Sequence, residues 1–106
     1  MNSAAIAPTP ATDRLARPWF VPTAEQARRF GAHLQRQLGP RHVLYGRAVT
    51  PIAARADADD VVFALGDGSG VALVHLTYAK RPAASAEWPP TAIFASLSAA
   101  LDGVDR

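Results

Sequence analysis

The chain has 106 residues, of which 49% are hydrophobic, and it contains no cysteine. This length and composition predict one domain with a real core, and they exclude disulfides and thiolate metal sites. No apolar run approaches the roughly 20 residues that span a bilayer, and the N-terminus lacks the features of a secretory signal, so the sequence predicts a cytoplasmic protein.

The net charge of +2 is unevenly placed along the chain. Residues 1–56 carry eight arginines against two carboxylates, whereas residues 57–106 carry three basic residues against seven carboxylates. Such asymmetry permits an anionic partner, although charges that cluster in sequence need not cluster in space.

Residues 1–18 contain three prolines among small residues without apolar period, so a disordered N-terminal tail is predicted there. Residues 19–106 are predicted to form a single small domain. It begins with Trp19, Phe20 and Val21, which we expect to dock on the core, with a partner-binding anchor as the alternative.

A first helix is predicted from Thr23 to Leu38. Thr23 and Gln26 have the spacing of a capping box, and apolar residues at helical spacing form one stripe: Ala27, Phe30, Leu34 and Leu38. Gly39-Pro40 is expected to end the helix, with the glycine in a left-handed conformation.

Two apolar runs, residues 61–65 and 71–78, flank the loop Gly66-Asp67-Gly68-Ser69-Gly70, which is the pattern of a β-hairpin. A strand near residues 48–56 precedes it, at a sheet edge because Pro51 cannot donate to a ladder. A second helix is predicted from Thr91 to Leu101, with an outer face free of charge: Ala92, Ala95, Ser96, Ser98 and Ala99.

The predicted fold is α+β, in the order α-β-β-β-α. We expect a three-stranded antiparallel meander with both helices packed on one face. The uncharged face of the second helix favours a homodimer contact, and an alanine-rich solvent face is the alternative.

His75 is the candidate for chemistry, because it interrupts an apolar strand and a histidine there can serve as a general base. A hydrogen-bonded core or rim histidine is the alternative. Asp57, Asp59 and Asp60 are interpreted as turn residues that bond local amides, since their spacing does not fit a calcium loop. The glycine-rich pentapeptide is interpreted as a turn and not as a phosphate loop.

Basic and aromatic residues of the kind that bind single-stranded nucleic acid also occur, at Tyr45, Arg47, Tyr78, Lys80 and Trp88. They lack a ribonucleoprotein signature, and Trp88 before two prolines is typical of a residue that packs against a sheet end. Nucleic-acid binding therefore stays a secondary hypothesis.

Residues 45–96 contain a set of short motifs: Tyr45-Gly46-Arg47, Asp59-Asp60-Val61-Val62-Phe63, Val74-His75-Leu76-Thr77-Tyr78 and Trp88-Pro89, with Thr91, Phe94 and Ser96. In these motifs the chain resembles a family of small bacterial proteins that has no established activity. The resemblance implies a common fold and directs attention to Arg47, Asp60, His75, Thr77 and Trp88.

The leading functional hypothesis is a non-catalytic interaction module that binds another protein or a copy of itself, without cofactor or metal. It rests on the lack of a complete catalytic constellation in the sequence and on the uncharged second helix. The alternative is a small-molecule-binding protein or enzyme with a pocket around His75, Tyr78 and Trp88. The tentative binding residues are Arg47, Asp60, His75, Thr77, Tyr78 and Trp88.

Overall fold

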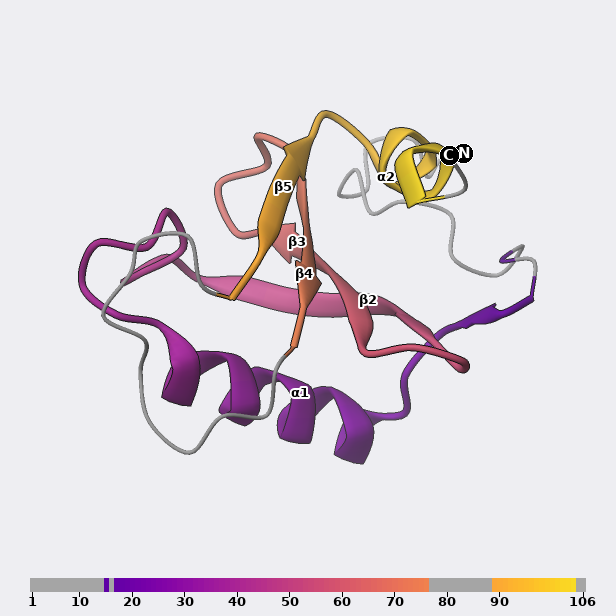
Figure 1. Cartoon of the computed structure of the whole chain (residues 1–106), viewed down its shortest axis with the longest axis horizontal. Helices are drawn as coiled ribbons and strands as arrows, with labels where there is room; N and C mark the ends of the chain where they lie inside the picture. The colour runs from indigo at the N-terminus through magenta and orange to yellow at the C-terminus, as the bar shows by residue number, and fades with distance from the viewer. Residues whose placement is uncertain (1–14, 16, 77–88, 105–106) are drawn as a thin grey trace, which may run out of the picture.

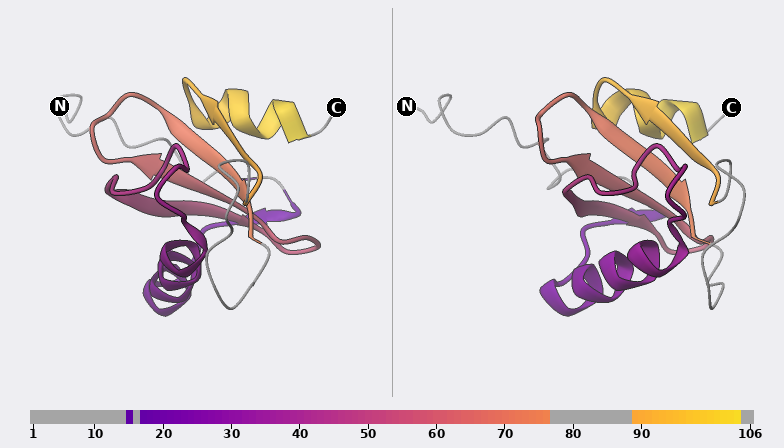
Figure 2. Two further views of the ribbon diagram at one scale, coloured as in Figure 1. Left: turned by 60° about the vertical axis from the view of Figure 1, so that its left-hand side comes forward. Right: turned by 90° about the vertical axis from the view of Figure 1, so that its left-hand side faces the viewer.

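The computed structural model describes Leu15, residues 17–76 and residues 89–104. It shows an α+β protein in which a five-stranded antiparallel sheet carries one helix on each face (Figures 1 and 2). The elements in chain order are β1 (Trp19–Phe20), α1 (Ala24–Gln37), β2 (Val49–Arg55), β3 (Asp60–Leu65), β4 (Val71–His75), β5 (Thr91–Phe94) and α2 (Leu97–Val104). The strands lie side by side in sequence order. Most of the predicted N-terminal tail lies outside the described residues.

The prediction of a three-stranded meander is wrong, because short strands extend it at both edges. Trp19–Phe20 pairs with β2, and Thr91–Phe94 pairs with β4 where a helix was expected. The second helix begins only after Ser96, whose hydroxyl accepts the Ala99 N–H at 3.1 Å. A serine at that position caps the helix, and the β-branched and aromatic residues before it suit the edge of β4.

The two helices pack on opposite faces of the sheet, so the prediction that both cover one face is also wrong (Figure 2). Neighbouring strand residues point to opposite faces, and both faces of β3 and β4 are buried. Two buried clusters result. One lies on the α1 side and includes Leu34, Leu38, Val61, Phe63, Leu65, Ala72 and Val74. The other lies on the α2 side and includes Trp19, Ile52, Ala53, Val62, Val71, Leu97 and Ala100.

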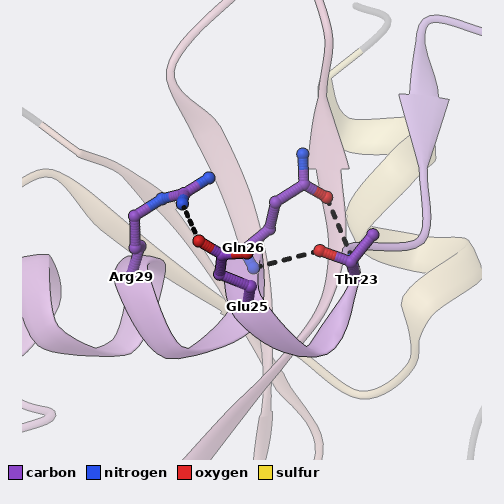
Figure 3. A network of polar contacts seen from close by, with 4 residues as sticks. All are labelled: Thr23, Glu25, Gln26 and Arg29. Atoms are coloured by element: carbon purple, nitrogen blue, oxygen red, sulfur yellow. Dashed lines mark hydrogen bonds and ion pairs between the residues drawn. The ribbon is translucent and has the colours of Figure 1, made fainter.

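The N-terminus of α1 is capped as predicted. The Gln26 N–H donates to the Thr23 hydroxyl at 3.1 Å, and the Thr23 N–H donates to the Gln26 side chain at 2.9 Å (Figure 3). Glu25 and Arg29 form an exposed ion pair beside it. The expected left-handed exit at Gly39 is wrong, because the chain leaves α1 through Leu38 in an extended conformation and Gly39 has no positive φ.

The β3–β4 hairpin is confirmed, and β2 runs along it with a bulge at Ile52. The Gly66 N–H donates to the carbonyl oxygen of Ala48, so the backbone groups of Ala48 face β3. Because the facing side alternates along a strand, this bond sets which residues of β2 face β3 and which face the outer edge. By that alternation, the nitrogen of Pro51 faces the outer edge, where β1 reaches only Ala54 and Arg55. Proline therefore costs this strand no bond to β3.

Within the described part of the chain, no helix has the length and apolarity needed to cross a membrane.

Candidate functional site

The structure brings together two of the predicted site residues, Asp60 and His75. They lie directly opposite each other in the β3–β4 register, and the Nδ1 atom of His75 lies 2.9 Å from a carboxylate oxygen of Asp60. An ionised carboxylate only accepts hydrogen bonds, so Nδ1 carries a proton. The turn interpretation of Asp60 is therefore wrong: it is the first residue of β3, and its side chain bonds a histidine across the hairpin.

Three further residues surround this pair, and the sequence analysis did not single them out for it. The Arg55 guanidinium lies 2.8 Å from an oxygen of Asp57 and 3.7 Å from one of Asp60. The same guanidinium lies over the ring of Trp19, its cross-strand neighbour, at 6.0 Å from the ring centroid. The Asp60 carboxylate is thus held between one cation and the His75 ring.

The His75 side chain is 52% exposed, whereas that of Asp60 is only 19% exposed. In the neutral ring, Nε2 carries the lone pair and can accept a proton from a bound molecule. Among the described residues, no group of three or more histidine, aspartate or glutamate side chains could hold a metal ion. The hydrogen bond to Asp60 leaves Nε2 as the ring nitrogen available for proton transfer.

Arg47 lies away from this pair, at the loop of the hairpin. Its guanidinium donates to Asp67 at 3.1 Å. Asp67 also accepts hydrogen bonds from the hydroxyl and backbone N–H of Ser69, which, ahead of the Arg47 charge, lower the pKa of the Asp67 carboxyl below its ordinary value of 3.8. The N–H groups of Gly66, Gly68 and Ser69 all donate hydrogen bonds within the protein. The loop is a turn, as predicted, and Arg47 stabilises it.

Thr77, Tyr78 and Trp88 lie outside the described residues, as does Lys80 of the nucleic-acid hypothesis. An open hollow of about 610 Å³ lies beside β1, and neither Asp60 nor His75 lines it. It is lined by Leu15, Arg17, Pro18, Trp19, Phe20, Val21 and Ala56. The predicted pocket around His75 thus stays a prediction.

His42 has a structural role that the sequence analysis missed. It is buried, and its Nδ1 accepts the N–H of Leu44 at 3.0 Å. Its Nε2 then carries the proton and lies 3.0 Å from the carbonyl oxygen of Pro89 and 3.1 Å from the hydroxyl of Thr91. This ring fastens the loop of residues 39–47 to the start of β5.

The outer edge of β5 is the second candidate site, and we call it the β5 edge. The N–H of His75 donates to the carbonyl oxygen of Pro90, which fixes the alternation of bonding directions along β5. Ala92 and Phe94 therefore face β4, whereas Thr91 and Ile93 direct their N–H and C=O groups outward. No strand of the described residues pairs with them.

The β5 edge is apolar and uncharged. Residues 91–101 contain no charged side chain, and Ile93 is 45% exposed. Val43 and Tyr45, which are also exposed, lie on the loop that His42 fastens to this strand. Open sheet edges usually carry lysine, proline or a bulge that prevents pairing with other chains, and β5 has none of these.

In comparisons with known proteins, no family model, no curated protein and no solved structure matches this chain.

Proposed function

We propose that this protein is a non-catalytic interaction module that binds an extended polypeptide segment at the β5 edge. The observation that carries the proposal is the uncharged strand at the end of the sheet, whose outer edge pairs with no other strand of the described residues. A segment that adds to such an edge gains main-chain hydrogen bonds, and side chains beside the edge provide selectivity. The sequence suggested the uncharged stretch from Thr91 to Leu101 as a contact surface. The proposal keeps it as the contact surface, although its first half is a strand and not a helix.

The side chains beside the edge support the same function. Ile93 lies on the α1 side of the sheet, since its cross-strand partner Ala72 belongs to the α1-side cluster. The loop with Val43 and Tyr45 is fastened to β5 through His42 and Thr91. An incoming strand would therefore gain apolar contacts on that side as well as backbone bonds along the edge.

A titration of the ¹⁵N-labelled chain with a short alternating valine–threonine peptide tests this proposal. We expect chemical-shift changes at Thr91 and Ile93 and protection of the Ile93 amide from hydrogen exchange. The matched control is the same peptide with N-methylated backbone amides, which cannot donate. Ile93→Lys should weaken binding by about tenfold or more, whereas Val21→Lys, at a similarly exposed position beside the other edge, should not. Shifts that are equal for both peptides, or absent, would contradict the proposal.

The Asp60–His75 pair supports a second candidate function, a small-molecule-binding protein or enzyme that uses His75 with Tyr78 and Trp88. The specific observation is the half-exposed ring held at 2.9 Å by a mostly buried carboxylate. This orientation suits a general base, because Asp60 fixes the proton on Nδ1 while the side chain is half exposed and Nε2 carries the lone pair.

Hydrolysis of p-nitrophenyl acetate, a generic activated ester, tests the second candidate. If His75 acts as a base, His75→Ala should lower the rate by roughly 100-fold, the lower end of what a positioned general base contributes. Asp60→Asn should also lower the rate, since the amide no longer fixes the ring proton. His33→Ala, a histidine of α1, is the control. Equal rates for all four proteins would rule out the catalytic form of this candidate, in which His75 acts as a base.

A further inference from the structure

The geometry of the β5 edge points to a second copy of this chain as its occupant, with the two β5 strands antiparallel about a two-fold axis at Ala92. This inference rests on the proposed function and names the partner. The two five-stranded sheets would join into one continuous sheet. A two-fold contact uses the same patch on both chains, so the patch has to be self-complementary in hydrogen bonding, shape and charge.

The hydrogen-bonding directions select the register. Only Thr91 and Ile93 direct their backbone groups outward, so they have to face outward-directed residues of the second chain. An axis at Ala92 places Thr91 opposite Ile93 of the copy and Ile93 opposite its Thr91, and both pairs exchange N–H and C=O bonds. An axis between two residues would place outward-directed groups opposite inward-directed ones. An axis at Ile93 would need bonds from Ala95, beyond the end of the strand.

The side chains fit this register. At the axis, Ala92 faces its own copy in a pair without mutual backbone bonds, where the two chains approach most closely and small side chains are favoured. Ala92 is exposed in the single chain. On the α1 side, Ile93 reaches the copy's Ile93 diagonally, which removes an exposed isoleucine from water.

The charges also permit self-pairing. Like charges brought into direct opposition destabilise a sheet, and residues 91–101 bring none. An acidic or basic partner would find no complementary charge on this strand. An uncharged strand with the same hydrogen-bonding pattern is what a copy of this chain supplies.

Sedimentation velocity over a concentration series, with the full chain, tests the inference through a proline substitution. Proline at Ile93 removes an N–H that faces outward and bonds nothing in β4, so Ile93→Pro should fold but dissociate. The expected result is a concentration-dependent dimer of the natural chain and at least about a tenfold rise in its dissociation constant for Ile93→Pro, because each copy loses a donor. Val21→Lys, at the opposite edge, should dimerise like the natural chain.

A melting curve separates loss of pairing from loss of folding. Ile93→Pro should melt cooperatively, whereas Ala92→Pro should be strongly destabilised, because the Ala92 N–H faces β4. A natural chain that stays monomeric at all concentrations, or a dimer that Ile93→Pro leaves intact, would overturn the inference. If the monomeric chain still binds the valine–threonine peptide, the edge binds strands and only the choice of a second copy is wrong.

Discussion

Truncation of Phe63 to alanine is expected to remove about 3–5 kcal/mol from the free energy of unfolding. Phe63 is fully buried in β3, the middle strand of the sheet, and belongs to the α1-side cluster. Its removal costs the transfer energy of the ring and leaves a cavity that packed neighbours on adjacent strands cannot fill. Since small domains are stable by about 5–15 kcal/mol, this single change removes a large fraction of the total.

Urea unfolding of Phe63→Ala beside Phe30→Ala measures this effect. Phe30, on α1, packs against the same cluster but is only partly buried, so its loss should cost distinctly less. Equal costs for the two variants would mean that the ring of Phe63 is not at the centre of the core.

The second large effect is expected from Gly70→Ala, at a cost of about 2–5 kcal/mol from backbone strain and steric overlap. Gly70 has a φ of 150°, which side-chain-bearing residues rarely adopt. A methyl group there would overlap the carbonyl oxygen of Phe94, with its carbonyl carbon at 3.3 Å. The oxygen and the carbon both belong to the backbone of Phe94 and not to a flexible side chain, so β5 has to move away from β4. The β5 edge should then lose its binding of extended peptides along with stability.

Two other glycines are matched controls for the same substitution, and thermal or urea unfolding of the three variants gives the comparison. Gly68 also has a positive φ, of 77°, but a methyl group there meets nothing within 4 Å, so Gly68→Ala should cost only about 1–2 kcal/mol. Gly31 lies in α1 with open space around it, and Gly31→Ala should stabilise the protein by up to about 1 kcal/mol. If Gly70→Ala proves no worse than Gly68→Ala, the close approach to Phe94 is not real.

The parts of the fold that the sequence predicted correctly depend on short-range signals. The capping box of Thr23 and the glycine-rich loop between apolar runs fix α1 and the β3–β4 hairpin from neighbouring residues alone. Thr91–Phe94 was wrongly predicted as part of the second helix, because Ile93 and Phe94 fit the same helical stripe as Leu97 and Leu101, which do lie in α2. The open edge of β4, which Thr91–Phe94 fills, is a tertiary feature that no local pattern reveals.

The sequence carries a signal for helices on opposite faces of the sheet. Residues 61–65 and 71–76 are apolar at almost every position, so both faces of the hairpin have to be covered. Helices on one face only would have left the other face of β3 in water. That unbroken apolar pattern predicts helices on both sides.

The site residues also divide into those that short-range signals imply and those that long-range contacts bring together. Asp60 and His75 lie five residues before Leu65 and five after Gly70, the residues that close the hairpin loop, so the hairpin register already implied their pairing. The contact of Arg55 with Trp19 depends on β1, and the role of His42 depends on the return of the chain at Pro89. Both are long-range contacts, which a single sequence does not show.

The β1 edge, at the other end of the sheet from β5, limits how many chains can add to the sheet. Of the strands that the structure describes, β1 is two residues long, and beside it β2 presents the bulge at Ile52 and the nitrogen of Pro51, which cannot donate. A strand that approaches from that side finds no regular ladder to extend. In the dimer inferred above, both β5 edges are used, and the outer strands that the structure describes are then the two β1 strands, which do not favour pairing. Assembly is therefore expected to stop at two chains and not to continue into fibrils.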